Sequence, residues 1–340
     1  MEHVTRFAEQ GRSVQARTLR KAADAAIARY RVDVRRVRRV ALESNATFRV
    51  DAAPGERYAL RVGIPGPISH SIAEIRSELR WIESLSHAPD IEVVRPVPNA
   101  TGDGVTVVEL DGLQEPLPCV LFKWIDGELL ARRLTAPNVE LLGALAASLH
   151  RHGARFRPPA DFAVPRYDRP FPFDEPVVLL DRNQPLVPPA RRAVYQAALR
   201  QVEAAIARLS ESGEPMRVLH GDLHAWNVKV TRGRAVAFDF EDLMLGWPVQ
   251  DIATTLYYWW GRTDFDALRS AFRRGYESVA PWPDTSGDEV STFIVGRALV
   301  IGNDAIQLGD SLPPGEVEAI LGRGEARIRE HLDRSPRIRG

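Results

Sequence analysis

The chain has 340 residues, more than a single hydrophobic core usually organises, so its length favours two domains or lobes. Hydrophobic residues make up 44% of it and charged residues 26%, as in a folded globular protein. The 45 basic and 45 acidic residues cancel, which argues against a protein that binds nucleic acid or a membrane surface through a net positive field.

The sequence predicts neither a membrane span nor a secretory leader. The most apolar stretch, residues 292–301, is shorter than the about 20 residues that a span needs, and it contains Arg297. The first six residues lack the apolar centre of a signal peptide. Cys119 is the only cysteine, so we expect no disulfide framework and no cysteine-rich zinc site. These features indicate a cytoplasmic globular protein of the size of an enzyme, without membrane contacts.

The first third of the chain predicts an antiparallel sheet accompanied by helices. Apolar positions recur at helical spacing over residues 14–30 and again over residues 71–84. Strand-like runs surround the second helix, at residues 34–41, 47–50, 58–62, 105–110 and 119–125. We assign residues 1–123 to a small lobe rich in β-structure.

The remainder of the chain is predominantly helical by the same criterion. Helical periodicity covers residues 139–152 and 191–209 and much of residues 252–276 and 291–306. Residues 158–189 are rich in proline and aromatic residues and predict an ordered but irregular segment. We place a hinge at residues 124–127 and assign residues 128–340 to a larger helical lobe, which gives a bilobal α+β fold.

A basic cluster at residues 35–39 has two interpretations. Its four arginines could form a nucleic-acid patch, or they could lie on the solvated face of a sheet. The valines at positions 34, 37 and 40 and the zero net charge favour the solvated face. We therefore expect no nucleic-acid partner.

Residues that could carry chemistry concentrate between positions 218 and 251. The loop 220–227, His-Gly-Asp-Leu-His-Ala-Trp-Asn, leads into two short strands around a turn at Gly233. A turn centred on Gly233 would place Asn227 opposite Asp239 in the hairpin 227–239. Amide and carboxylate oxygens suit Mg²⁺, which takes few protein ligands besides phosphate oxygens. Asp222 could then orient an attacking hydroxyl, as phosphoryl transfer requires.

A lone His-Gly-Asp would more often be a turn than a site, because Gly and Asp favour turns. The combination of Asp222, Asn227 and Asp239 on a predicted loop and hairpin instead favours a catalytic site.

These segments resemble a known family. Residues 220–227 are similar to the HGDxxxxN loop of the aminoglycoside phosphotransferase-like family, residues 238–242 resemble its metal-binding strand end, and residues 248–253 resemble the start of the following helix. The resemblance covers about residues 19–276 and implies a protein-kinase-like fold. The family includes antibiotic kinases, choline and homoserine kinases and a bacterial stress-response protein kinase, so it leaves the acceptor open.

The resemblance implies Asp222 as the catalytic base and Asn227 and Asp239 as the ligands of Mg²⁺. His224 stands where the kinase loop usually holds a lysine that contacts the transferred phosphoryl group. Its imidazole could make that contact by a hydrogen bond, or it could be a packed loop residue.

Two further residues would support the loop. His220 would brace it, and Asp251 would cap its own helix and hydrogen-bond the backbone of the catalytic loop.

The aromatic run at residues 257–260 predicts mostly helix core, with one or two rings facing the acceptor.

On the nucleotide side, Arg61 on a strand would grip the ATP phosphates and be oriented by Glu78 on the next helix. Glu74, one turn away, is an alternative partner. Protein kinases use a lysine here, and arginine keeps the charge but changes the geometry.

The loop that would cover the nucleotide has no glycine, and Ser44, Asn45 or Thr47 would supply its donors. By resemblance, Phe122 would lie behind the adenine, and the backbones of Lys123 and Ile125 would contact its edge.

The favoured hypothesis is an ATP- and Mg²⁺-dependent phosphotransferase acting on a hydroxyl of a small molecule such as an antibiotic or an amino alcohol. A protein Ser/Thr hydroxyl is the alternative acceptor. A non-catalytic nucleotide-binding regulator is a separate hypothesis, motivated by the glycine-free loop and by Arg61. Acidic residues at the acceptor site would favour a cationic substrate, with candidates at Asp264, Asp266, Asp304 and Asp310. Nothing in the sequence indicates an oligomeric state.

Overall fold

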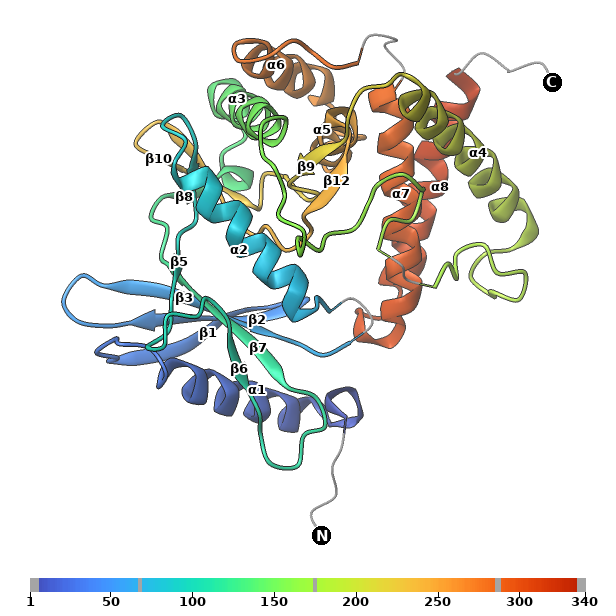
Figure 1. Ribbon diagram of the computed structural model, residues 1–340. Coiled ribbons are helices and arrows are strands. Elements are labelled where there is room, and N and C mark those ends of the chain that lie inside the picture. Colours follow the sequence, from blue (N-terminus) through green and yellow to red (C-terminus); the bar gives the residue numbers. More distant parts are fainter. Residues whose placement is uncertain (1–5, 67–68, 174–175, 285–288, 335–340) are drawn as a thin grey trace. The chain divides into compact units, whose positions relative to one another are not determined.

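The computed structural model describes residues 6–66, 69–173, 176–284 and 289–334 (Figure 1). The chain divides into two compact units. The first comprises residues 1–127, 157–163 and 236–241, and the second comprises residues 128–156, 164–235 and 242–340. The combination of an antiparallel sheet with many helices confirms the predicted α+β class. The lobe bounds and the hinge at 124–127 stay a prediction.

The first unit contains an antiparallel sheet with the strand order β1-β2-β3-β7-β5, in which β6 also pairs with β7. The strands are β1 (Arg36–Leu42), β2 (Asn45–Asp51), β3 (Arg57–Gly63), β5 (Pro96–Val97), β6 (Thr106–Val108) and β7 (Leu117–Lys123). The two-residue β4 (Glu92–Val93) runs parallel to the end of β11 (Arg234–Ala237). The helices are η1 (Phe7–Glu9), α1 (Arg12–Ile27) and α2 (Ile72–Ser86). The arginines of β1 are exposed on this edge strand.

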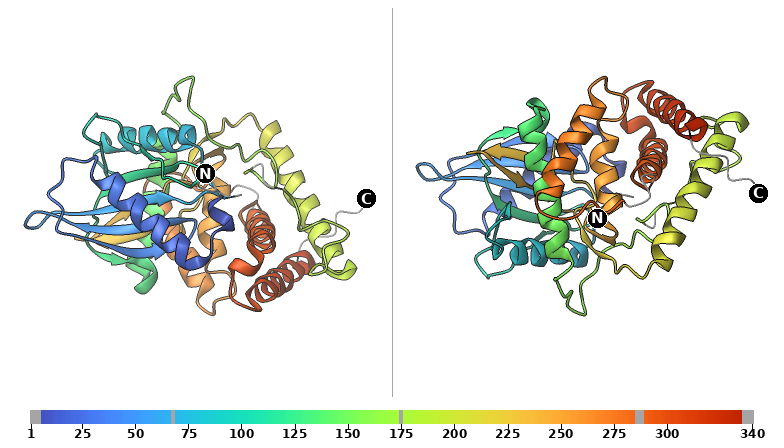
Figure 2. Two further views of the ribbon diagram at one scale, coloured as in Figure 1. Left: turned by 90° about the horizontal axis from the view of Figure 1, so that it is seen from below. Right: turned by 90° about the horizontal axis from the view of Figure 1, so that it is seen from above.

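Helix α1 covers one face of this sheet (Figures 1 and 2). Its buried side chains recur every three or four residues, and most are alanines, which allow the helix to approach the strands closely. They share a core with buried side chains of β2, β3 and β7, among them Phe48, Leu60, Val62 and Leu121.

Helix α2 lies against the opposite face (Figure 1). It begins with a capping box in which Ser71 Oγ accepts from the Glu74 amide at 3.2 Å and Glu74 Oε2 accepts from the Ser71 amide at 2.7 Å. Successive strand residues point to opposite faces, so Arg61 points away from the α1 core that takes Leu60. Arg61 therefore reaches α2.

The second unit is mainly helical. Its helices are η2 (Leu130–Arg132), α3 (Ala136–Gly153), α4 (Pro189–Glu211), α5 (Pro248–Tyr257), α6 (Phe265–Glu277), α7 (Glu289–Leu308), η3 (Gly309–Ser311) and α8 (Glu316–Arg334). Helices α4, α7 and α8 pack together around a common core (Figures 1 and 2). The short strand β8 (Glu128–Leu129) pairs with β10 (Val228–Thr231), and β9 (Arg217–Leu219) pairs with β12 (Met244–Gly246).

The hairpin that follows the loop 220–227 differs from the prediction. Both Arg232 and Gly233 have positive φ angles, +50° and +74°, so the turn consists of these two residues and is not centred on Gly233. Strand β10 begins at Val228 and β11 ends at Ala237, so neither Asn227 nor Asp239 belongs to a strand. The predicted strand pairing of these two residues was wrong because the two-residue turn shifts the register and the strands are short.

Helices α3 and α6 approach each other through glycines. A β-carbon on Gly143 would lie 2.0 Å from the carbonyl oxygen of Phe272, and one on Gly275 would lie 1.9 Å from that of Glu140. Both obstacles are backbone atoms within helices, which cannot move aside individually. The two helix axes therefore come closer than any larger residue at these positions would allow.

We expect Gly143→Ala to lower the free energy of unfolding by about 1–3 kcal/mol, because the added methyl group forces α3 and α6 apart. Gly322→Ala in α8 is the matched control, since a β-carbon there meets nothing within 4 Å. Alanine should stabilise that helix by up to about 1 kcal/mol. Urea denaturation of both variants measures the difference, and equal stabilities would contradict the close crossing.

No helix within the described residues is both long and apolar enough to cross a membrane.

Candidate active site

The loop 220–227 is anchored at its start by a glycine, Gly221. The loop directly follows β9, and β9 pairs with β12 through Leu219 and Met244. Gly221 has φ +81°, and a β-carbon there would lie 1.9 Å from the carbonyl oxygen of Asp242. Only glycine permits this conformation and this approach. The loop is thereby held against the segment that precedes β12.

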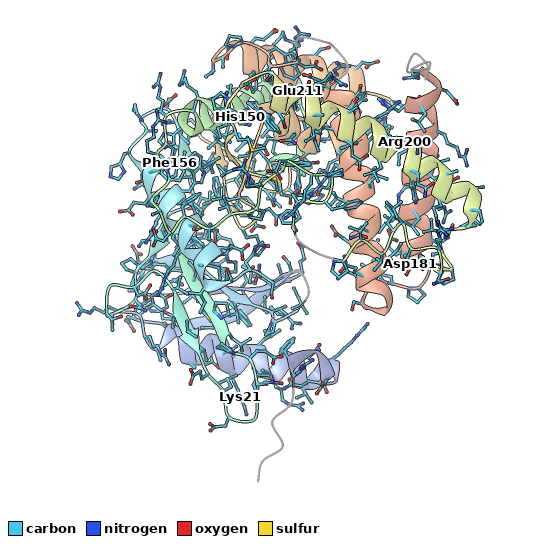
Figure 3. The ribbon with its side chains drawn as sticks, turned by 45° about the vertical axis from the view of Figure 1, so that its right-hand side comes forward. Lys21, His150, Phe156, Asp181, Arg200 and Glu211 are labelled. Atoms are coloured by element: carbon cyan, nitrogen blue, oxygen red, sulfur yellow. The ribbon has the colours of Figure 1, made fainter. Side chains whose placement is uncertain are left out.

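Asp251, in the first turn of α5, holds the backbone of the loop. The prediction that it also caps its own helix was wrong, because the N-cap of α5 is Trp247. Asp251 Oδ1 accepts from the Gly221 amide at 3.0 Å and its Oδ2 from the His220 amide at 3.3 Å. His150 belongs to α3 (Figure 3), and its Nε2 is 3.0 Å from Oδ2 of Asp251. The other ring nitrogen, Nδ1, is 3.0 Å from the hydroxyl of Tyr276 on α6. Burial alone would raise the pKa of Asp251, but the hydrogen bond and charge of His150 outweigh it and lower that pKa.

The Asp222 carboxylate receives four donors within the second unit. Oδ1 lies 2.7 Å from Arg297 Nη2 and 3.2 Å from the Tyr258 hydroxyl. Oδ2 lies 3.1 Å from His224 Nε2 and 3.2 Å from Asn227 Nδ2. Burial would raise the pKa of Asp222, but the charge of Arg297 and the hydrogen bond from His224 lower it far below its usual range. The carboxylate is therefore ionised and fixed in orientation.

His224 is a packed residue of this loop. Its Nδ1 accepts from the Trp226 amide at 3.1 Å, so the ring proton is on Nε2 and is donated to Asp222. Its ring centroid lies 4.1 Å from that of Tyr258. Of the two predicted alternatives, this geometry favours a loop residue that orients Asp222.

Asn227 is suited to hold a cation. Its Nδ2 donates to the backbone oxygen and the carboxylate of Asp222, and Oδ1 accepts from no residue that the structure describes. Asp239 lies in the first unit, has φ +66°, and is near enough to Arg61 to raise the pKa of that arginine. Amide and carboxylate oxygens are hard ligands that fit Mg²⁺. Outside the segments left undescribed, no group of three or more His, Cys, Asp or Glu side chains could hold a metal ion.

Arg61 in the first unit pairs with Glu78. Its Nη1 donates to Oε1 at 2.9 Å, and Nη2 donates to Oε2. Glu74 is occupied by the capping box of α2. Burial would lower the pKa of Arg61, but the carboxylates of Glu78 and Glu241 outweigh it and raise that pKa, so the guanidinium stays charged. Its Cζ lies 5.4 Å from the centroid of the Phe122 ring.

The loop between β1 and β2 is bound by Glu241. Ser44 Oγ donates to Oε1 at 2.8 Å, and Asn45 Nδ2 donates to Oε2. Arg61 Nη1 lies 3.6 Å from the same carboxylate. The sequence indicated Ser44, Asn45 and Arg61 as phosphate donors, and the structure brings all three to one anionic oxygen pair.

The predicted adenine-contacting strand is the end of β7. The Lys123 amide donates to the Arg95 carbonyl at 2.8 Å, so the carbonyl of Lys123 is the group left for an adenine edge. The Lys123 ammonium pairs with Glu56 at 2.7 Å. Ile125 follows two residues after β7 ends.

Comparison with known proteins matches residues 36–287, more than half of the chain, to the phosphotransferase enzyme family. The chain belongs to this family. The predictions of the family and of a phosphotransferase enzyme are thereby confirmed.

Two relatives resemble this phosphotransferase in sequence. An uncharacterised protein, sll1119, of Synechocystis sp. is 27% identical over 221 residues, which cover 63% of this chain and 59% of that protein, less than two thirds of its length. Amicoumacin kinase of Bacillus subtilis is 26% identical over 242 residues, covering 67% of this chain and 68% of that protein.

Solved structures share the fold. A microcompartment-associated aminopropanol kinase has a TM-score of 0.74 at 23% identity, covering 92% of this chain and 97% of that one. The amicoumacin kinase hAmiN, in complex with AMP-PNP, Ca²⁺ and Ami, has a TM-score of 0.75 at 21% identity, covering 94% and 96%. These likenesses confirm the predicted kinase-like fold.

Sequence reasoning on this phosphotransferase missed Arg297, Tyr258 and His150. Arg297 carried a signal, because a single charge within the apolar stretch 292–301 needs a buried partner. Tyr258 was included only in an aromatic run assigned mostly to the core, and it is 37% exposed with its hydroxyl at Asp222. Of the acidic residues considered for a cationic acceptor, Asp264 is already paired with Arg262, with 2.7 Å between Oδ1 and Nε. The side chain of Asp310 lies outside the described residues.

Proposed function

We propose that this phosphotransferase transfers the γ-phosphoryl group of ATP, in the presence of Mg²⁺, to a hydroxyl group of a small molecule of the antibiotic or amino-alcohol type. The carrying observation is the ionised Asp222 carboxylate, oriented by four donors and held on a loop that Asp251 fixes. The relatives named as kinases of amicoumacin and of aminopropanol support a small acceptor. The AMP-PNP in one of the similar structures supports an adenine nucleotide.

In this mechanism, Asp222 accepts a hydrogen bond from the acceptor hydroxyl and aims its oxygen at the γ-phosphorus. The new bond joins that oxygen to phosphorus, the bond from phosphorus to the bridging oxygen breaks, and the hydroxyl proton passes to Asp222. ADP leaves with the electron pair. Mg²⁺, held by Asn227 and Asp239, would neutralise charge on the phosphates. Arg61, Ser44 and Asn45 would bind phosphate oxygens.

The four donors around Asp222 support its role as the base, and the two backbone amides that donate to Asp251 support its role in holding the loop. Asn227 and Asp239 are the proposed metal ligands because of the chemistry of their oxygens, and His220 is a proposed loop support. His224 is better suited to orient Asp222 than to contact the phosphoryl group, because its Nε2 proton is engaged. Phe122, Lys123 and Ile125 remain the proposed adenine contacts. No described contact specifically favours a protein acceptor or a regulator without activity.

ADP release with ATP and Mg²⁺ over a panel of small hydroxyl compounds, with Ser/Thr-containing proteins in parallel, tests this function. We expect a small molecule to stimulate release and EDTA to abolish it. Asn227→Ala should lose the metal-dependent rate, and Trp226→Ala, whose side chain is 54% exposed, is the matched neighbour that should keep it. Nucleotide binding without transfer to any acceptor would indicate the regulator, and transfer only to protein would indicate the alternative acceptor.

A further inference from the structure

Arg297 is a buried cation next to the proposed base. It lies on α7, whose neighbouring residues are almost all buried and apolar, and the residue is 8% exposed. Burying a charge on such a helix is costly unless its hydrogen bonds are satisfied. Burial would lower the pKa of Arg297, but Tyr258, Asp222 and Asp242 outweigh it and raise that pKa, so the guanidinium stays charged.

Its donors are only partly used. Nη2 donates to Asp222 at 2.7 Å and lies 3.4 Å from the Tyr258 hydroxyl. Nε is buried without a hydrogen-bond partner, and Nη1 has none among the residues that the structure describes. A guanidinium carries five N–H donors, and leaving donors of a buried charged group unmatched is unfavourable. Nη1 is the donor left to meet an oxygen acceptor that arrives from solvent.

We infer that Arg297 binds a carbonyl-type oxygen of the acceptor, belonging to a carboxylate or an amide close to the hydroxyl that receives the phosphoryl group. This inference rests on the proposed function and narrows its acceptor class. The planar fork of arginine suits such an oxygen. Asp222, whose side chain is 17% exposed, and the partly exposed Tyr258 show that the cluster reaches solvent.

The spacing restricts the acceptor further. Arg297 and Asp222 are in direct contact, so hydrogen bonds of about 2.7–2.9 Å from each to the substrate place the two substrate oxygens at most roughly 8 Å apart. The shorter separations, with both oxygens on one side of the pair, fit a carbonyl one or two carbons from the hydroxyl, as in 2- and 3-hydroxy acids and their amides. An ammonium group at that position would be repelled by Arg297, so within the proposed acceptors the inference favours those with a carbonyl oxygen beside the hydroxyl over simple amino alcohols.

The test uses three probes that share their hydroxyl groups and differ at one carbon: glycerate, glyceramide and glycerol. Their dissociation constants are measured by calorimetry on the full chain saturated with AMP-PNP and Mg²⁺. We expect glycerate or glyceramide to bind at least about tenfold more tightly than glycerol. Arg297→Met should bring the ratio close to one, and Arg297→Lys should retain only part of the preference.

Arg262→Met is the matched control, because it removes an exposed guanidinium that pairs with Asp264 and should keep the preference. Unchanged AMP-PNP affinity and an unchanged melting curve show that a variant is folded. Should Arg297→Met not fold, the wild-type ratio and Arg297→Lys decide. Equal affinity for all three probes, or no binding of either carbonyl probe, overturns the inference.

The outcomes separate this inference from the proposed function. A carbonyl preference without ADP formation from any acceptor would remove the proposed function and leave the binding site. Phosphoryl transfer that is equally fast to acceptors with and without a nearby carbonyl would leave the function and remove the role of Arg297. Comparing glycerate with glyceramide shows whether the negative charge contributes beyond the oxygen.

Discussion

Asp222→Ala lowers kcat by about 10²–10⁴-fold, because the hydroxyl loses both its orienting carboxylate and its proton acceptor. The variant also leaves Arg297 and His224 without their shared anion. ADP release with saturating acceptor measures the effect. AMP-PNP affinity should change little, because the proposed nucleotide contacts belong to other residues.

Asp222→Asn refines this prediction. The amide keeps the size of the side chain but removes the charge and presents an NH₂ group to existing donors. We expect a loss of kcat similar to that of alanine. Glu211→Ala, at the exposed end of α4 (Figure 3), is the control for removing a carboxylate and should leave kcat unchanged. A near-normal kcat for either Asp222 variant would refute its assignment as the base.

Asp251→Ala lowers the free energy of unfolding by about 3–5 kcal/mol and abolishes activity. The substitution leaves three buried donors without their acceptor: the amides of His220 and Gly221 and the ring nitrogen of His150. Each buried donor without an acceptor lowers the stability of the folded state. Asp251→Asn retains an acceptor oxygen and should lose less. Urea denaturation measures both, and an alanine variant as stable as the wild type would contradict this account.

The pH dependence of that loss follows from the lowered pKa of Asp251. A carboxyl group with a depressed pKa in the folded state stabilises the protein above its unfolded pKa of about 3.9. This contribution is lost as the pH falls through the folded-state pKa. The stability gap between wild type and Asp251→Asn should therefore be constant between neutral pH and about pH 5 and should narrow only in stronger acid.

Local periodicity predicted most of the regular structure. The sheet strands and helices α1, α2, α3, α4 and α7 lie within a few residues of their predicted ranges, because each has its own apolar pattern. Much of residues 252–276 is helical, as predicted, in two helices, α5 and α6, that are separated by a turn with Gly261 at φ +85°. The two-residue strands were not predicted, since pairs of residues carry no periodicity. Helix α8 was not predicted either, and its apolar pattern is weak because it buries only Leu321 and Ile328.

The site was predictable only where its residues are close in sequence. Asp222, Asn227 and Asp239 share one motif, whereas the partners of the loop come from distant helices: His150 from α3 and Arg297 from α7. Such contacts depend on how helices pack, which no local spacing encodes. The choice of Glu78 over Glu74 for Arg61 likewise depended on Glu74 being used in a capping box.

The carboxylate of Glu241 gives the β1–β2 loop an anion of its own. A phosphate that binds to Ser44, Asn45 and Arg61 would have to displace this carboxylate, because these donors already have an anionic acceptor. The affinity gained is then only the difference between two sets of charge-assisted hydrogen bonds. When ADP departs, the same donors recover their internal partner. Such an exchange would keep the loop ordered in both states and favour rapid turnover over tight retention of the nucleotide.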